Sequence, residues 1–154
     1  MKKLLAAGID LAGSFGLYLI YVPLTSWLFQ ILPLTRAEKF FAVPVIEETL
    51  RFVSICLGGL TQYAFTLIFA ISEYINYLGY ARTEMGMVPD GYSFYRFLCI
   101  FVHVGLLWYQ IKMFRKYQRT KRKYYLFVGF FGAVALHELY NHSIGSIIYS
   151  IVVR

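Results

Sequence analysis

The stretch FFAVPVIEETLRFVSICLGG, residues 40–59, decides the fold that we expect for this chain. Two adjacent acids, Glu47 and Glu48, and a base, Arg51, lie midway along a run that is otherwise apolar. A charged residue at the centre of a membrane helix costs about 2.5–3.5 kcal/mol, and such residues pair with each other or line a cavity. If this run crosses a bilayer, its charges indicate a polar site between helices.

The composition favours a membrane protein. Of the 154 residues, 59% are hydrophobic and only 15% are charged, and the mean hydropathy is +0.59. A soluble domain of this size needs more polar surface, whereas apolar stretches of about 20 residues are long enough to cross a bilayer. We therefore predict an all-α fold, a polytopic transmembrane helical bundle that forms a single integral membrane domain over residues 1–154.

The apolar pattern divides into about five membrane-spanning segments. Pro23 and Pro33 are expected to interrupt the first segment, and the glycine pair between residues 57 and 62 to join the second and third as a helical hairpin. Residues 81–95 form the longest polar loop. The expected segments are roughly 5–32, 40–58, 61–80, 95–112 and 124–152.

The distribution of basic residues sets the expected topology. Seven of the fifteen lysines and arginines fall between Lys112 and Lys123. A basic loop between apolar segments is typical of the cytoplasmic side of a membrane and of contact with anionic headgroups, rather than of nucleic-acid binding. The N-terminus, with Lys2 and Lys3, then also lies in the cytoplasm as an uncleaved anchor. We expect an integral protein of a bacterial cytoplasmic membrane, in contact with the lipid bilayer.

Four of these segments place polar side chains at similar depths. With a helical rise of about 1.5 Å per residue, the three glutamates lie about 15 Å from the cytoplasmic surface, the first histidine about 14 Å and the second about 20 Å. We therefore expect one shared polar layer near the bilayer midplane. Its members are Glu47, Glu48, Glu73, His103, His137 and Asn141.

The helical faces agree with these depths. On the last segment, small residues recur every four positions in a stripe on the same helical face as His137 and Asn141. Because small residues allow close helix packing, we expect this face, with both side chains, to point into the bundle. Phe65, Phe69, Glu73 and Tyr77 form a similar stripe on the third segment. Glu47 and Arg51, four residues apart, are expected to neutralise one another partly. The small residues of the first stripe are Gly129, Ala133 and Gly145.

A site with these groups supports the hydrolysis of amides. Desolvation and repulsion between neighbouring acids raise the pKa of a carboxyl group, which suits a glutamate to general acid–base catalysis. Histidine and asparagine donate hydrogen bonds to a developing oxyanion. Alternatively, glutamates and two histidines hold Zn²⁺ with one position open for water. A nucleophilic mechanism through Ser54, Ser72 or Cys99 has less support from the sequence.

Two other polar features read as structural. Glu138 and His142 form a second pair with a spacing of four, about 100° around the helix from the first stripe. Asp10, near the cytoplasmic end of the first segment, is expected to cap a helix or to reach the interface. We assign neither feature to the site.

Four short motifs resemble those of a known family, in the same order. They are EETLR at residues 47–51, FAISE at 69–73, HVG beginning at His103, and HELYN at 137–141. They are similar to the EExxK, FAxxE, H and HxxxD signatures of PrsW-type intramembrane proteases. These enzymes are related to the CAAX prenyl endopeptidases and bacteriocin-processing enzymes, whose versions are EExxxR, FxxxH and HxxxN. The resemblance covers residues 44–142. Arg51 replaces the PrsW-type lysine, and Asn141 replaces the aspartate.

The resemblance implies an intramembrane endopeptidase that cleaves a membrane protein or a membrane-anchored peptide. Glu47 and Glu48 would then include the base that activates water. Glu73, His103 and His137 would hold a metal such as zinc, or would hold water and the oxyanion, and Asn141 would complete the last motif.

A second interpretation stays open, because the chain has fewer segments than most of that family. It is a non-catalytic subunit of a larger membrane complex, whose inherited polar site binds a partner helix or conducts ions.

Overall fold

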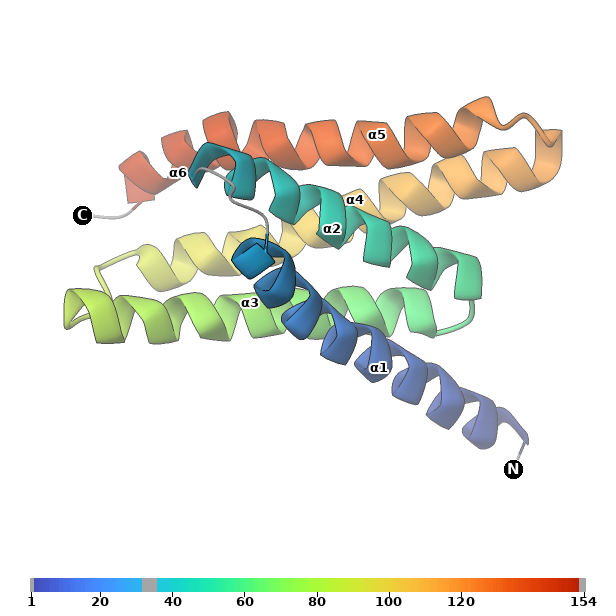
Figure 1. Cartoon of the computed structure of the whole chain (residues 1–154), viewed down its shortest axis with the longest axis horizontal. Helices are drawn as coiled ribbons and strands as arrows, with labels where there is room; N and C mark the ends of the chain where they lie inside the picture. The colour runs from blue at the N-terminus through green and yellow to red at the C-terminus, as the bar shows by residue number, and fades with distance from the viewer. Residues whose placement is uncertain (1, 32–35, 153–154) are drawn as a thin grey trace.

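The computed structural model describes residues 2–31 and 36–152 of the chain, and nearly all of them are helical (Figure 1). The all-α prediction is confirmed, since the described residues contain no strand. In chain order the elements are α1 (Lys2–Ile31), α2 (Arg36–Leu57), α3 (Thr61–Met85), α4 (Tyr92–Thr120), α5 (Tyr124–Leu139), the π-helical turn η1 (Tyr140–Ile144) and α6 (Gly145–Val152).

The first four expected segments each correspond to one helix, with differences at the ends, and the fifth corresponds to α5, η1 and α6 together. α1 runs through Pro23 without a break, and Pro33 lies outside the described residues. The basic stretch after Lys112 is not a loop as predicted: α4 continues to Thr120, because the stretch contains no glycine or proline to end the helix. The polar loop predicted over residues 81–95 is likewise reduced to the turn between Met85 and Tyr92.

The predicted glycine turn between α2 and α3 is confirmed, and it also holds α1 in place. Gly58 and Gly59 both have positive φ angles, of 76° and 58°. The Leu60 amide that follows them donates to Asp10 Oδ2 at 2.8 Å. Asp10 therefore caps the start of α3, one of the two roles expected for it, and fastens α1 to this turn.

Gly59→Ala is expected to destabilise the protein by about 1–2 kcal/mol, the cost of a left-handed conformation for a residue with a Cβ atom. That Cβ would also meet the carboxylate of Asp10. Chemical unfolding in detergent measures the effect. Gly105→Ala is the control, because Gly105 is helical and open space surrounds its Cβ position. Equal stability of the two variants would contradict the role of the turn.

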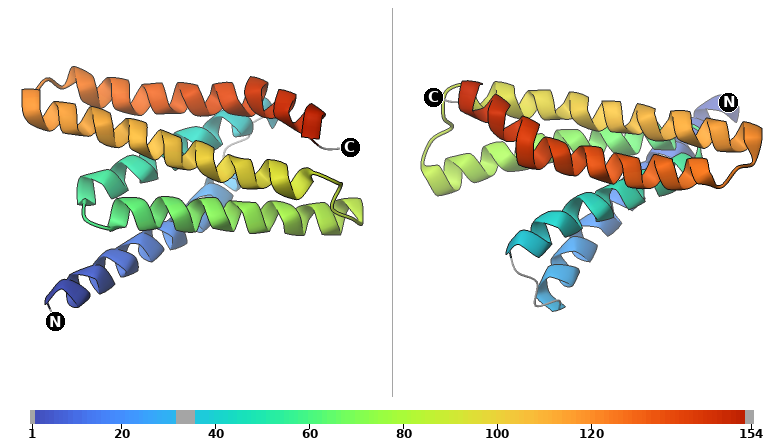
Figure 2. Two further views of the ribbon diagram at one scale, coloured as in Figure 1. Left: turned by 180° about the vertical axis from the view of Figure 1, so that it is seen from behind. Right: turned by 90° about the horizontal axis from the view of Figure 1, so that it is seen from above.

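The helices form a layer with a crossing pair. α3, α4 and α5 lie side by side, while α1 and α2 cross this layer, and the C-terminal part of α1 and the N-terminal part of α2 lean away from it (Figure 2). The start of α1, the α2–α3 turn and the α4–α5 turn all lie at one end of the molecule (Figure 1). The α3–α4 turn and α6 lie at the other end.

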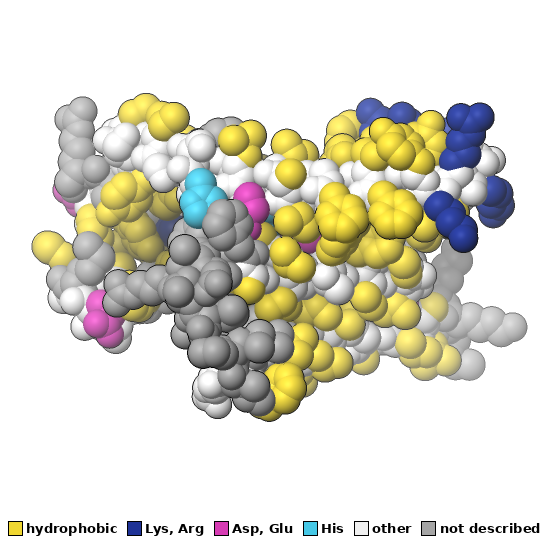
Figure 3. All heavy atoms as spheres, turned by 45° about the horizontal axis from the view of Figure 1, so that its top comes forward, with side chains coloured by type: hydrophobic (Ala, Val, Ile, Leu, Met, Phe, Trp, Pro, Cys, Tyr) yellow, Lys and Arg dark blue, Asp and Glu magenta, His cyan; other side chains and the backbone are white. Residues whose placement is uncertain are grey.

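Polar and charged groups gather inside this bundle beside an apolar core, and large apolar groups cover its outside. Buried polar and charged side chains come from all of the first five helices. Large hydrophobic side chains cover the outside, including Leu4 at 79% exposure and Trp108 at 67%. Lysines and arginines collect at the end that holds the α4–α5 turn (Figure 3). The buried polar residues are Ser14, Glu47, Glu48, Arg51, Ser54, Thr61, Thr66, Arg96, His103, Gln110 and His137.

Two helical stretches in the described part of the chain, Leu4–Thr25 and Tyr92–Thr120, are long and apolar enough to cross a membrane. They give weak support for a location in a membrane. Two stretches, and not the five predicted, meet this criterion. α2 and α3 carry the acids of the interior, and the helical run that begins at Tyr124 changes from α to π geometry at Tyr140.

Candidate functional site

The acids and imidazoles of the predicted polar layer come together inside the bundle. α2 contributes Glu47 and Glu48, and α3 contributes Glu73. His103 on α4 and His137 on α5 lie with their ring centroids 5.2 Å apart. A continuous set of hydrogen bonds and ion pairs joins all five side chains.

Glu48 is the centre of this network and is fully buried. Its carboxylate pairs with Arg51, one helical turn away. It also accepts hydrogen bonds from Gln110 Nε2 at 3.0 Å and from His137 Nδ1 at 2.8 Å. The direct ion pair of Arg51 is therefore with Glu48 and not with Glu47. Side chains three or four residues apart on a helix can contact each other, so Arg51 could reach either acid. It pairs with Glu48, the acid that Gln110 and His137 also contact.

The contacts of His103 define which of its ring nitrogens carries the proton. Arg51 Nη2 lies 2.8 Å from His103 Nδ1, and Glu73 Oε2 lies 2.6 Å from His103 Nε2. Since an arginine only donates hydrogen bonds, Nδ1 must be the acceptor. The proton of the ring then lies on Nε2 and is donated to Glu73. Both ring nitrogens of His103 are engaged in this arrangement.

Glu73 has a second partner, Arg96, which the sequence analysis did not include. Arg96 Nη2 donates to Glu73 Oε1 at 2.8 Å. The guanidinium group stacks on the ring of Tyr77, 3.6 Å from its centroid. Glu73 is thus held between an arginine and an imidazole, both of them buried.

Glu47 has a different environment from the other two acids. Its Oε1 accepts a hydrogen bond from the Tyr21 hydroxyl of α1 at 3.1 Å. Its Oε2 lies 3.6 Å from His137 Nε2. Because His137 Nδ1 donates to Glu48, Nε2 carries a lone pair in the neutral ring. Both arginines of the layer are engaged by Glu48 and Glu73, so Glu47 and His137 face each other without an arginine between them.

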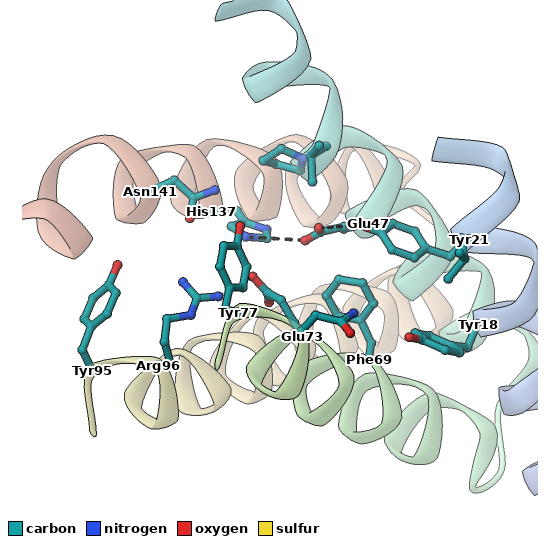
Figure 4. A pocket seen from close by; sticks show the side chains of 14 residues that line it. Tyr18, Tyr21, Glu47, Phe69, Glu73, Tyr77, Tyr95, Arg96, His137 and Asn141 are labelled. Carbon is teal, nitrogen blue, oxygen red and sulfur yellow. Dashed lines mark hydrogen bonds and ion pairs between the residues drawn. The ribbon is translucent and has the colours of Figure 1, made fainter. Parts of the chain in front are cut away.

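A cavity of about 380 Å³ opens beside Glu47 and His137. The two side chains point toward each other at its wall, and Asn141 lies one turn beyond His137 (Figure 4). Glu48 and His103 lie behind this lining and contact it through His137 and Glu73. The cavity is lined by Tyr18, Tyr21, Val22, Val43, Pro44, Glu47, Phe69, Glu73, Asn76, Tyr77, Tyr95, Arg96, His137 and Asn141.

The ligand set that the structure offers to a metal differs from the predicted one. In the described part of the chain, the group whose ligand atoms lie within 4.8 Å of one another is Glu47, His103 and His137. Glu73, predicted as a ligand, is instead engaged by Arg96 and His103. His103 would also have to break its contact with Arg51 or with Glu73 to bind a metal. This arrangement does not fit a three-residue metal site.

Three residues of the site were missed by the sequence analysis: Tyr21, Arg96 and Gln110. Arg96 is the second residue of the expected segment 95–112, where a charge is common near a membrane surface, so its position did not mark it as the central position of Glu73 marked that acid. Tyr21 and Gln110 gave no signal, because a tyrosine or a single glutamine is common at helix surfaces.

The remaining polar groups have structural contacts. His142 Nε2 lies 3.0 Å from Glu138 Oε2, which confirms the second pair. Ser54 donates to the backbone carbonyl of Arg51. Cys99 Sγ lies 3.0 Å from the Tyr140 hydroxyl.

No family model matches this chain, and no curated protein or solved structure is significantly similar to it. The fold and the site therefore define a structural class and not a family: an all-α protein with a buried network of carboxylates, imidazoles and arginines beside a cavity. The resemblance of its motifs to PrsW-type proteases stays a prediction from the sequence.

Proposed function

We propose that the chain is a polytopic membrane protein whose helical segments cross the bilayer five times, with the N-terminus and the α4–α5 turn in the cytoplasm. The inverted distribution of side chains supports this arrangement, because a bundle in lipid is apolar outside and keeps its charges in the interior. The basic residues at the end of α4 and at the start of α1 lie at the same end of the molecule, as the positive-inside rule requires.

Within that membrane, we infer that the chain is an intramembrane endopeptidase of the PrsW type that its motifs resemble. The observation that carries this proposal is the pair of Glu47 and His137, 3.6 Å apart at one wall of the cavity. A water molecule beside this pair can donate one hydrogen to the Glu47 carboxylate and the other to the lone pair of His137 Nε2. That is the arrangement of a water held for attack by a general base.

In the proposed reaction, Glu47 takes one proton from the water as its oxygen bonds to the carbon of a peptide carbonyl. The carbonyl oxygen becomes an oxyanion, and we assign the side-chain amide of Asn141, which lines the same cavity, as its donor. Collapse of the tetrahedral intermediate breaks the carbon–nitrogen bond, and Glu47 returns the proton to the leaving amine. One water is consumed, and a carboxylic acid and an amine are formed.

The rest of the network positions this pair. Glu48 accepts a hydrogen bond from His137 Nδ1 and so fixes the lone pair at Nε2, facing the cavity. Arg51 holds Glu48, and His103 connects Arg51 to Glu73. We therefore assign Glu48 and His103 as positioning residues, while Glu47 is the base.

The position of the cavity indicates the side from which a substrate enters. Ile55, Leu107 and Ile111 form a hydrophobic cluster with Phe114, between the polar layer and the end that carries the α2–α3 and α4–α5 turns. The lining residues come from the middle of the helices and from their halves away from that end. The proposed substrate is thus a membrane protein or membrane-anchored peptide whose cleaved bond lies in the outer half of the bilayer. A hydrophobic closure at the cytoplasmic end also argues against a pathway for ions.

The test compares the membrane proteins of cells that contain the protein with those of cells that lack it. Mass spectrometry of new chain termini is expected to find a membrane protein that is cut only when the protein is present, in a segment on the outer side. Identical termini in the two cultures would overturn the proposed activity. The cavity would then be the partner-binding site of a non-catalytic membrane subunit.

Tyr21→Phe is expected to slow the cleavage of that substrate about ten- to a hundredfold, since a hydrogen bond to a charged group contributes about 1.5–3 kcal/mol. The hydroxyl that this variant removes orients Glu47. The rate in proteoliposomes measures the effect. Tyr80→Phe, which removes a hydroxyl from a side chain that is 60% exposed on α3, is the control. A Tyr21→Phe protein with the wild-type rate would exclude the proposed role of the Tyr21 hydroxyl in orienting Glu47.

A further inference from the structure

The outward face of α4 changes from apolar to basic along its length. Its first part exposes large hydrophobic side chains, and its last part exposes four cations. Spacings of three and four residues place them all on one face of the helix. The apolar stripe consists of Phe97, Phe101, Val104 and Trp108, and the basic group consists of Lys112, Arg115, Lys116 and Arg119.

The basic group forms a groove and not only a charged surface. A depression of about 280 Å³ is lined by its four cations together with Trp108 and Ile111. Ile111 is buried and forms the floor. Lys112 Nζ lies 5.4 Å from the centroid of the Trp108 ring. The groove therefore joins cationic side chains to an indole at the boundary with the apolar stripe.

The charge of the groove is not balanced within the bundle. No acid occurs between Lys112 and Lys123. Among the described residues, the ion pairs engage other side chains and none of these four cations. Four like charges on adjacent turns repel one another, and an anion held between them relieves that repulsion.

The depth of the groove identifies the kind of anion. From His103, in the polar layer near the bilayer midplane, to Lys112 the helix rises about 14 Å, close to the hydrocarbon depth of one leaflet, which is about 15 Å. The groove then lies at the level of the headgroups of that leaflet. Tryptophan is enriched at this boundary, and Trp108 occupies it.

We propose that this groove binds the phosphate headgroup of an anionic phospholipid of the cytoplasmic leaflet, with its acyl chains along the apolar stripe of α4. The inference rests on the membrane arrangement proposed above, but not on the protease activity. It concerns a face of α4 that does not line the catalytic cavity.

The test uses quenching of Trp108 fluorescence by brominated lipids in nanodiscs. Trp27→Phe leaves Trp108 as the single tryptophan of the chain. Brominated phosphatidylglycerol, diluted into phosphatidylcholine, is expected to quench Trp108 at mole fractions about tenfold lower than brominated phosphatidylcholine does, since each basic residue near a membrane surface adds severalfold to the affinity for an anionic lipid.

Arg115→Gln with Arg119→Gln is expected to abolish this preference. Arg122→Gln with Lys123→Gln removes the same charge outside the groove and is expected to change the preference less than twofold. Equal quenching by the two lipids, or an equal loss in the two double variants, would overturn the groove as a lipid site. An absence of quenching by either brominated lipid would overturn the membrane arrangement itself, whereas a lack of protease activity would leave this inference intact.

Discussion

Glu47→Gln is expected to lower the rate of substrate cleavage by about 10²–10⁴-fold, the usual contribution of a general base, while the protein stays folded and inserted. The amide of glutamine has nearly the shape of the carboxylate and still accepts the hydrogen bond from Tyr21. It cannot take a proton from water. Cleavage of the identified substrate by the purified protein in proteoliposomes measures the rate, and circular dichroism in the same lipid measures the fold.

Glu138→Gln provides the matched control for this variant. Glu138 lies on α5 next to His137, but its carboxylate pairs with His142. We expect its replacement to keep the rate within about twofold of the wild type, since its contact does not reach the cavity. Loss of cleavage in both variants, or in neither, would contradict the assignment of Glu47 as the base.

Glu48→Gln is expected to have its largest effect on stability. Its carboxylate is fully buried and shares contacts with Arg51, Gln110 and His137. Removal of one partner of a buried ion pair leaves the other charge uncompensated, which costs about 3–5 kcal/mol. The free energy of unfolding in detergent, from a denaturant titration, measures this loss.

The Glu138→Gln control separates the destabilisation by Glu48→Gln from the effect of a general loss of negative charge. The Glu138–His142 pair is partly exposed, and such a pair contributes about 1 kcal/mol or less. We therefore expect Glu48→Gln to be clearly less stable than both Glu138→Gln and Glu47→Gln. If Glu48→Gln unfolds at the wild-type denaturant concentration, the buried pair with Arg51 is not what holds α2 in the bundle.

Together these variants distinguish two roles that adjacent residues have on one helix. Glu47 and Glu48 differ by about 100° around α2. One faces the cavity and Tyr21, and the other faces Gln110 and His137 in the interior. The first is expected to affect chemistry without stability, and the second to affect stability and, through His137, the geometry of the site.

Much of this arrangement could be predicted from the sequence because it follows from local regularities. The helical rise placed Glu73, His103 and His137 at similar depths. The spacing of Gly129, Ala133 and Gly145 turned His137 toward the interior, where these four residues are buried. The glycine pair before α3 gave the hairpin, since positive φ angles favour glycine. Each of these inferences needs only one helix and its geometry.

The sequence by itself therefore determined the helical segments, the turn at Gly59 and the layer in which the acids and imidazoles meet. Only the tertiary structure decided which of them pair: Arg51 with Glu48, Arg96 with Glu73, and Tyr21 with Glu47. The physical reason is that a helix fixes the depth and direction of its own side chains, whereas a hydrogen-bond partner depends on which neighbouring helix brings a donor within about 3 Å. That selection left Glu47 and His137 facing the cavity together.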